Sequence, residues 1–486
     1  MKRPKYTDII ILIVSTIIFS YIATKAFVSS FTHDESITYL HFISAKFMDI
    51  ISNQGAYSNN HVLNTLCMKY SDRIFGNSEI SLRLPNLLML LVYFIYTYLI
   101  LRKSNPVLCI AIFILMATNT ALIDFFGLAR GYGMSVGFMI MSLYHLMASF
   151  HGHRNVNLIL FNIGALLAIL SNFTMLSFYL SALLVFNMVT FAECRGNSRE
   201  KFNFFRINKV NIVLFFLLFI VLYEPVRKAV KFNTFNFGGK QGFVTDTVSS
   251  LIYHMFMNVN LTSIGMVLLQ VSILLIVIVS SMLIIIHIYR SDHTFIARSR
   301  ALIMVNLIIL SISFESIIQH YILKTDYLIG RFSLFLFPLF ILNLGFLFEY
   351  LVEFRIRFFI QGLAVSLAIL SVSNFYLNRN LYACAEWGYD METKNAVAAL
   401  MADRQNNPSD KQKMKMGINW LFEPTINFYR QTQNIGWLLP VDRNGLTEFD
   451  DYDYIFNADS GMLKNKSHSV IFSSEKTNTV LIRNIK

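Results

Sequence analysis

The stretch that decides the fold is residues 9–26, IIILIVSTIIFSYIATKA, an apolar run shortly after the basic segment Met1–Lys5. About 20 apolar residues cross the hydrocarbon core of a bilayer as one helix. The run resembles a secretory signal peptide, but no small-residue cleavage site follows it, because bulky and acidic residues (31–35, FTHDE) come next. We therefore expect an uncleaved first span with a cytoplasmic N-terminus.

The composition extends this expectation to the whole chain. Of its 486 residues, 55% are hydrophobic and 14% are charged, and the mean hydropathy is +0.52. A soluble domain of this length usually carries about 25% charged residues. The 45 Phe and 8 Pro also suit long lipid-facing helices better than a loop-rich soluble enzyme. The sequence predicts an all-α polytopic membrane domain.

Hydropathy and charged breaks predict about eleven spans. They are expected at residues 8–28, 85–101, 106–123, 132–150, 157–171, 174–192, 210–224, 264–289, 301–319, 332–349 and 358–377. With the N-terminus inside, the cytoplasmic connections carry most of the basic residues, and the short outer connections hold only Arg130, Lys324 and Arg331. The net charge of +12 thus reflects membrane orientation, and we expect no nucleic-acid partner.

Three longer segments are expected outside the membrane, at residues 29–84, 225–263 and 378–486. In the first, apolar residues at helical spacing predict one interfacial helix over residues 63–74, stopped at Gly76. A second amphipathic helix is expected over residues 37–50, and such helices lie at the membrane surface. The chain therefore divides into a transmembrane domain, residues 1–377, and an outer tail, residues 378–486.

The tail is more polar and predicts a small α/β domain. Helices are expected near residues 393–404 and 424–433, and short strands near residues 416–421, 453–456, 469–472 and 479–482. About a hundred residues suffice for a core of their own. Cys67 and Cys384 both fall outside, but nothing in the sequence indicates that they pair.

Three groups of polar residues fall on the outer side of the membrane. They are His33-Asp34-Glu35, then Asp124 with Arg130 and Tyr132, and finally His320, Lys324, Tyr327 and Arg331. Each has a plain structural explanation, as interfacial charges, a snorkelling arginine or an aromatic belt. Ionisable groups at the membrane are nevertheless often functional. The glycine-rich residues 238–242 lack phosphate-loop spacing and are expected to be a flexible loop.

The order of these groups resembles the C-type, multi-span glycosyltransferases, in the branch of the protein O-mannosyltransferases and the lipid A aminoarabinose transferase (glycosyltransferase family 39). The matching phrases are Asp34-Glu35, Asn59 to Asn64, Phe75-Gly76 leading into Leu82-Arg83-Leu84-Pro85, Ala129-Arg130-Gly131-Tyr132 and Arg331-Phe332. The resemblance covers about residues 8–350. It departs at Val62-Leu63, where relatives often have Pro-Pro, and the chain lacks the soluble repeats of eukaryotic O-mannosyltransferases.

The resemblance implies an inverting transfer of a hexose or pentose from a polyprenyl-phosphate donor to a lipid, glycan or protein hydroxyl. The compact tail and the richness in Lys, Asn, Ile and Phe favour the outer face of a bacterial inner membrane, and an endoplasmic reticulum membrane with the active side facing the lumen has the same topology. Asp34 is the expected base, supported by Glu35, and Asp124 either orients Arg130 or holds a divalent metal with Asp34. Whether a metal is needed stays open. The expected donor-phosphate ligands are Arg130, Arg331 and Lys324, and the expected substrate contacts are His61, Tyr132, His320 and Tyr327.

A transporter or flippase of lipid-linked sugars is the main alternative, because it also needs many spans and buried polar groups. Transporters often contain repeated halves with paired broken helices, and their polar sites lie at mid-membrane. The sequence has no such repeat, and its polar groups gather on one side. A ligase-like or polymerase-like membrane transferase would share the donor lipid but not the order of the matching phrases.

Overall fold

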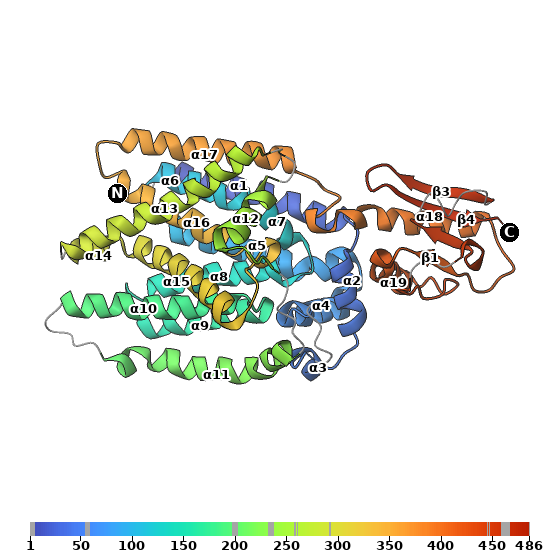
Figure 1. Ribbon diagram of the computed structural model, residues 1–486, viewed down its shortest axis with the longest axis horizontal. Helices are drawn as coiled ribbons and strands as arrows, with labels where there is room; N and C mark the ends of the chain where they lie inside the picture. Colours follow the sequence, from blue (N-terminus) through green and yellow to red (C-terminus); the bar gives the residue numbers. More distant parts are fainter. Residues whose placement is uncertain are drawn as a thin grey trace.

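The computed structural model describes residues 5–53, 59–196, 203–231, 238–256, 259, 261–290, 293–444, 446, 448–457 and 467–485. Long helices lie side by side in one body, and the tail projects from one end of it (Figure 1). Eight described helices are long and apolar enough to cross a membrane. They are α1 (Lys5–Val28), α5 (Glu79–Leu101), α9 (Arg154–Ser171), α10 (Met175–Gly196), α11 (Phe204–Lys231), α13 (Ser263–Tyr289), α15 (Arg300–Leu323) and α17 (Arg357–Asn378).

A further span is broken. α6 (Pro106–Ala117) is followed by α7 (Thr120–Ile123) and the 3₁₀ turn η1 (Asp124–Gly127), with a 58° bend between them. The side chain of Asn119 accepts a hydrogen bond from Leu122 N at 2.9 Å, which caps α7 and restarts the helix. The span expected over residues 106–123 is therefore bent rather than continuous.

The expected count of eleven spans is not confirmed, although a helix covers part of every expected span. The structure has eight such helices in its described part, or nine with the bent pair. α8 (Gly131–Ala148) carries the buried polar residues Ser135, Ser142 and His145, and α16 (Leu336–Leu351) is only 16 residues long. Both pack inside the bundle, so their length and composition differ from those of the lipid-facing helices.

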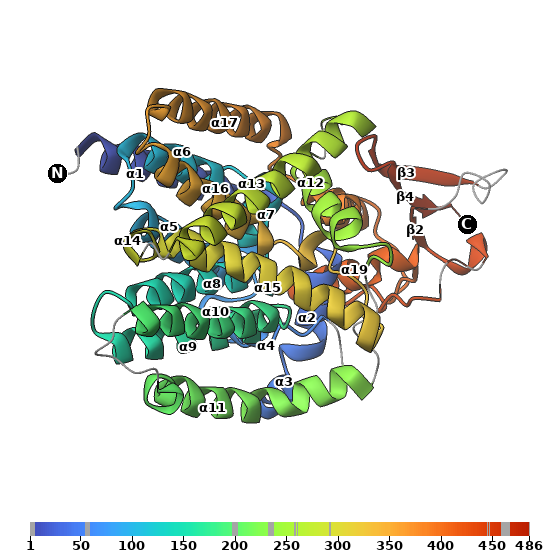
Figure 2. The same cartoon turned by 60° about the vertical axis from the view of Figure 1, so that its left-hand side comes forward.

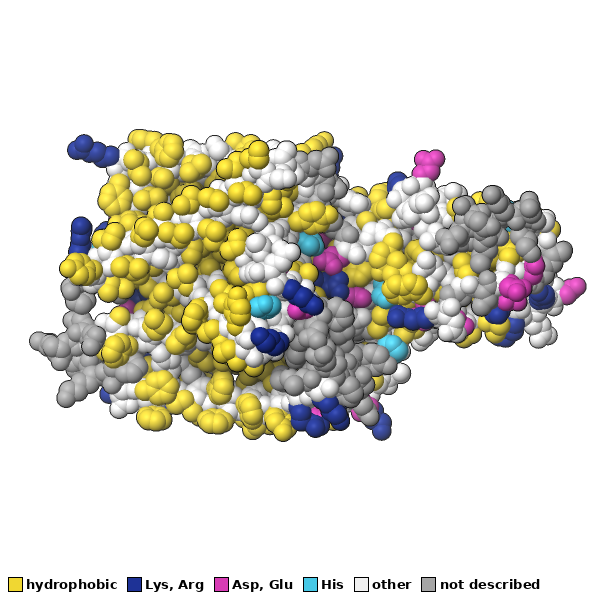
Figure 3. Space-filling view, viewed as in Figure 1, with side chains coloured by type: hydrophobic (Ala, Val, Ile, Leu, Met, Phe, Trp, Pro, Cys, Tyr) yellow, Lys and Arg dark blue, Asp and Glu magenta, His cyan; other side chains and the backbone are white. Residues whose placement is uncertain are grey.

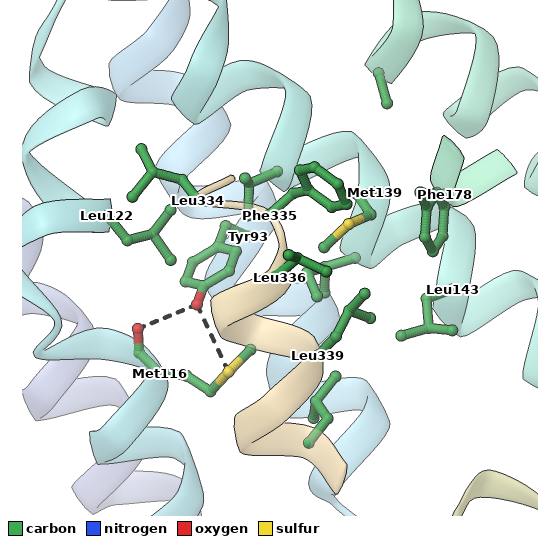
Figure 4. Packing of buried hydrophobic residues seen from close by; sticks show 14 of the residues in the cluster. Tyr93, Met116, Leu122, Met139, Leu143, Phe178, Leu334, Phe335, Leu336 and Leu339 are labelled. Carbon is green, nitrogen blue, oxygen red and sulfur yellow. Dashed lines mark hydrogen bonds between the residues drawn. The ribbon is translucent and has the colours of Figure 1, made fainter. Parts of the chain in front are cut away.

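The core between the helices is apolar. Leu122, Met139, Leu143, Phe178, Leu334 and Leu339 are almost fully buried there (Figure 4). The hydroxyl of Tyr93 donates to Met116 O at 3.1 Å, so this buried polar group is satisfied. Hydrophobic side chains also cover much of the helical body on the face shown in Figure 3, where charged ones gather toward its ends and on the tail. This distribution fits a lipid-facing bundle.

The first outer segment forms short helices at the end of the bundle that faces the tail (Figure 1). α4 (Val62–Phe75) ends at Gly76, whose φ of +84° suits glycine, and this confirms the expected helix and its stop. The second expected helix is instead two, α2 (His33–Phe42) and α3 (Phe47–Ile51). The ammonium of Lys69 donates to the carbonyls of Ile43 and Ala45, which fixes the chain between them in a non-helical course.

Two short elements, η2 (Phe243–Val248) and α12 (Ser249–Met255), precede α13, and α14 (His293–Arg298) precedes α15. The glycine-rich residues 238–242 are packed: Gly239 and Tyr327 exchange backbone hydrogen bonds of 2.9 and 2.8 Å. A Cβ at Gly238 would lie 2.2 Å from Tyr327 O. These glycines permit a close backbone approach, so the expected flexible loop is a bridge to residues 325–331.

The tail contains the expected helices and strands, with small shifts. Its elements are η4 (Ala385–Glu392), α18 (Thr393–Asn406), β1 (Met416–Ile418), η5 (Trp420–Phe422), α19 (Glu423–Thr432), η6 (Phe449–Asp451), β2 (Tyr454–Phe456), β3 (His468–Ser474) and β4 (Thr479–Asn484). The sheet order is β1-β2-β4-β3, with β1 and β2 parallel and the other two pairs antiparallel. Cys67 and Cys384 form no disulfide bond with each other.

The tail and the first outer segment share one hydrophobic core. Phe31 stacks on Phe428 with ring centroids 4.1 Å apart, and Tyr39 meets the same ring edge-on at 5.1 Å. Phe31 N donates to the hydroxyl of Tyr429 at 2.8 Å. α19 accordingly lies beside α2 in both views (Figures 1 and 2). Segments from opposite ends of the chain thus pack together beside α2, the helix that carries Asp34.

Candidate active site

The first turn of α2 carries two neighbouring carboxylates with different surroundings. Thr32 is the N-cap, and its backbone N–H donates to Glu35 Oε2 at 2.9 Å, the backbone half of a capping box. Acidic residues are stabilised at a helix N-terminus by the helix dipole. Consecutive residues on a helix point in directions about 100° apart. Asp34 and Glu35 therefore reach different partners.

Glu35 is closed inside the protein. Its carboxylate accepts two hydrogen bonds from Arg83, at 2.9 Å and 2.7 Å, and one from Ala129 N at 2.6 Å. Both side chains of this pair are 0% exposed. Arg83 also donates to the carbonyls of Ala26, Ser29 and Ser30 at the end of α1. The pair ties α1, α2, α5 and the loop before α8 together, and Glu35 has no free access to a substrate.

Asp34 lies where two arginines from distant segments meet. Its Oδ2 is 3.4 Å from Nη2 of Arg130 and 3.4 Å from Nη2 of Arg331, which belongs to η3 (Gly330–Phe332). Its Oδ1 is 3.4 Å from the side-chain nitrogen of Asn59. Oδ2 is buried and accepts no hydrogen bond from any described residue. Oδ2 of Asp34 thus faces two positive charges and keeps its capacity to accept a hydrogen bond.

The two arginines are held differently. Arg130 is 1% exposed, and its Nη1 donates to Thr38 Oγ1 and Asn59 O, both at 3.1 Å. Arg331 is 24% exposed, and its Nε donates to the hydroxyl of Tyr132 at 3.1 Å. An incoming anion reaches Arg331 more easily, whereas Arg130 is occupied in fixing α2 and residue 59.

Glu386, His254 and Trp387 complete this cluster, and the sequence did not single them out. Glu386 Oε2 accepts from Nη1 of Arg331 at 2.6 Å, and Oε1 lies 3.3 Å from Nε2 of His254. The guanidinium of Arg331 lies 4.9 Å from the ring centre of the buried Trp387. These three residues come from α12 and from η4 at the start of the tail, and no local motif joins positions so far apart.

The third predicted carboxylate, Asp124, has another partner. Its Oδ2 accepts from Nζ of Lys25 at 2.6 Å, and both side chains are largely buried. This pair links α1 to the bent span at η1. Asp124 is thus neutralised by Lys25 rather than by Arg130. Among the described residues, no three His, Cys, Asp or Glu side chains gather as a metal site. With Asp34 and Asp124 each facing cations, the residues present do not fit a divalent ion.

His61 and Tyr132 lie at the wall of the cluster. Nδ1 of His61 is 2.7 Å from Ser171 O, so this nitrogen carries the proton, because a carbonyl only accepts. Burial, followed by the nearby charge of Arg130, holds the pKa of His61 well below its usual value, so the ring is neutral. Its Nε2 is buried and has no described hydrogen-bond partner. The ring packs edge-on against Tyr132 at 4.7 Å.

The remaining predicted residues lie at the end of α15 and in the loop that leads from it to η3. Nδ1 of His320 is 2.8 Å from Thr325 O, and the ring stacks on Tyr327 at 4.4 Å. Tyr327 is buried and pairs through its backbone with Gly239. Lys324 is exposed at the end of α15, with a left-handed φ of +56°. In this arrangement His320 and Tyr327 shape the loop that presents Arg331.

No protein-family model matches the chain, and no curated protein matches it in sequence. Among solved structures, the chain is similar to ArnT from Cupriavidus metallidurans in two states. The apo structure aligns with a TM-score of 0.53 at 10% identity, covering 98% of this chain and 97% of ArnT. The structure bound to undecaprenyl phosphate aligns with a TM-score of 0.52 at 11% identity, covering 98% of each chain. This likeness confirms the expected fold: the chain has the C-type glycosyltransferase fold, tail included.

Proposed function

Because the chain has the C-type glycosyltransferase fold, we propose that it is an inverting glycosyltransferase using a polyprenyl-phosphate sugar. The acceptor is a hydroxyl group at the outer face of the membrane. ArnT binds undecaprenyl phosphate in one of its structures, and a lipid phosphate is the chemistry that the partly exposed guanidinium of Arg331 suits. The carboxylate oxygen of Asp34, which lies between two arginines and accepts no hydrogen bond from a described residue, is the observation that carries the proposal.

The proposed step moves one proton and one sugar. The acceptor oxygen attacks the anomeric carbon while its proton passes to Oδ2 of Asp34. The bond from the anomeric carbon to the phosphate oxygen breaks, and the lipid phosphate leaves with the electron pair. Its negative charge grows in the transition state, so Arg331 stabilises the transition state more than the ground state. Arg130 keeps Asp34 and Asn59 aligned, and no step needs a metal.

The proposed orientation puts this cluster and residues 378–486 outside a bacterial inner membrane, with the N-terminus in the cytoplasm. It is supported by basic residues at the opposite ends of the spans, such as Arg102, Lys103 and Arg154. We keep the tail as an outer domain in this proposal. It contributes Glu386 and Trp387 directly to the cluster, so it does more than cover the membrane face.

The test is transfer from a panel of radiolabelled polyprenyl-phosphate sugars by the purified protein in nanodiscs, with Asp34→Asn as the control. Consumption of one donor, even with water as acceptor, that disappears in Asp34→Asn supports the proposal and names the sugar. If folded protein consumes no donor but moves the same lipids across liposome membranes, the chain is a flippase and the proposal is wrong.

A further inference from the structure

One carboxylate joins three parts of the chain beside Asp34. Glu386 at the start of the tail contacts His254 of α12 and Arg331 of η3, and these three side chains are each at most 24% exposed. Glu386 contacts neither Asp34 nor Arg130 in any described interaction, so it acts on the cluster through Arg331. It differs in this respect from Asp34, whose buried Oδ2 lies directly between Arg130 and Arg331.

The hydrogen bonds of His254 specify its protonation. Its Nδ1 is 2.6 Å from the carbonyl oxygen of Ser250, which only accepts. Its Nε2 faces the carboxylate of Glu386 at 3.3 Å. Both ring nitrogens must donate to satisfy these two acceptors, and only the imidazolium has two N–H groups. The geometry therefore gives His254 a positive charge.

Arg331 is fixed on several sides. Nη1 donates to Glu386 and Nε donates to Tyr132, while the ring centre of Trp387 lies 4.9 Å from the guanidinium carbon. Gly330, with a φ of +54°, starts this turn, and its N–H donates to Ser250 Oγ at 3.0 Å. A Cβ at Gly330 would lie 3.2 Å from His254 Cε1. With these groups engaged, Nη2 is the part of the guanidinium that faces Asp34.

The charges of the cluster are matched to a lipid phosphate. Arg130, Arg331 and the imidazolium of His254 face two carboxylates, Asp34 and Glu386. One positive charge is thus left for an anionic ligand. Loss of the His254 proton would remove that excess and would also take away one of the two described partners of Glu386.

We propose that Glu386 is a positioning residue that aims Arg331 at the donor phosphate, and that the imidazolium of His254 holds Glu386 in place. This inference rests on the proposed function and adds the group that prepares the phosphate site. Fixed donors stabilise a developing charge better than donors that must reorganise during the reaction. The tail thereby controls the site through a single carboxylate.

A pH dependence follows with a definite sign. The hydrogen bond to Glu386 raises the pKa of His254 above its usual value, while burial and the charge of Arg331 oppose this. The His254 imidazolium keeps its second proton below this raised pKa and loses it as pH rises through that pKa. Two charged groups face His254, Glu386 from η4 and Arg331 from η3. Its titratable neighbour on α12 is Tyr253. The carboxylate of Asp246 on η2 is instead engaged by the backbone N–H groups of Gln241 and Gly242.

The experiment measures equilibrium binding of undecaprenyl phosphate to the full chain in nanodiscs, together with donor KM and kcat. We expect Glu386→Gln to weaken binding and raise KM about tenfold, the effect of one hydrogen bond to a charged group. The matched control is Glu353→Gln, which breaks the exposed Arg298–Glu353 pair of 2.8 Å and should change neither value. Equal binding by Glu386→Gln and wild type overturns the inference.

The pH profile needs no variant and covers the case in which Glu386→Gln does not fold. Wild-type binding should fall as pH rises through the raised pKa of His254, even though the phosphate itself gains charge as pH rises. His254→Gln should bind weakly at all pH values, and its profile should lack this fall. Wild-type binding that strengthens steadily with pH overturns the role of His254. If the wild type neither binds undecaprenyl phosphate nor consumes any donor, the proposed function itself fails, and the inference fails with it.

Discussion

Asp34 and Glu35 are adjacent in one helical turn, yet they lie in opposite kinds of ion pair. Glu35 and Arg83 form a closed pair, fully buried, with two direct hydrogen bonds and further bonds to surrounding backbone groups. Asp34 and Arg331 form an open pair at 3.4 Å with partial exposure. A closed pair fixes structure, whereas an open pair keeps bonding capacity for a ligand. Two neighbouring carboxylates can therefore have different roles, one structural and one in the site, because their ion-pair partners differ.

The largest effect is expected from breaking the closed pair. Arg83→Met leaves the carboxylate of Glu35 buried without its cation, which destabilises a protein by about 3–5 kcal/mol. The double variant Arg83→Met with Glu35→Leu should recover most of this loss, because no unpaired charge remains. Size-exclusion profiles after heating, in detergent, measure both variants. If Arg83→Met alone is as heat-resistant as the wild type, the Glu35–Arg83 pair is not needed for stability.

Breaking the open pair at its carboxylate should affect turnover without affecting folding. Asp34→Asn keeps the shape of the side chain but removes the proton acceptor, and the loss of a general base lowers kcat about 10²- to 10⁴-fold. Thermal stability and undecaprenyl-phosphate binding should stay close to those of the wild type. Wild-type turnover in this variant would remove the assignment of Asp34 as the base.

A smaller effect is expected at the other side of the open pair. Arg331→Lys keeps the charge but cannot contact Glu386, Tyr132 and Asp34 at once, because it lacks the planar fork. The loss of one charged hydrogen bond, about 1.5–3 kcal/mol, corresponds to a roughly 10- to 150-fold drop in kcat/KM. Steady-state kinetics with varied donor measure this drop, and an unchanged kcat/KM would exclude Arg331 from donor binding.

The smallest effect is expected at Lys324. Its side chain is exposed at the end of α15, and an exposed substitution usually changes a free energy by less than about 0.5 kcal/mol. Lys324→Ala should therefore change donor KM less than about threefold. A larger change in the same kinetic assay would support Lys324 as a donor-phosphate ligand. The phosphate site would then include the end of α15 as well as the Asp34–Arg331 pair.

What the sequence predicted well depends on local pattern. The helix α4 and its stop at Gly76 follow from helical spacing and a left-handed glycine, and the tail strands follow from short alternating runs. The break between α2 and α3 was missed, because it depends on Lys69, a residue 20 or more positions away. Periodicity reports which face of an element is buried, but it does not report a contact made by a distant side chain.

The same limit applies to the candidate site. Asp34, Arg130 and Arg331 were predicted from a family resemblance, and the structure brings them together. Asp124 was grouped with Arg130 because the two are close in sequence, although its partner is Lys25 on α1. Glu386 and His254 carried no signal, since each is an ordinary polar residue of a short helical element, η4 or α12, until folding places it beside Arg331.

The core shared by the first outer segment and the tail also sets the order of events during synthesis. Phe31 cannot form its hydrogen bond to Tyr429 until that residue, 398 positions later in the chain, has been synthesised. At about 5–20 residues per second, the ribosome needs roughly 20–80 s to deliver that partner. During this interval Phe31 and Tyr39 lack the ring of Phe428 that packs on both of them in the fold. Premature termination between α17 and α19 would leave all the apolar helices but no partner for these two rings, and we expect such products to be degraded.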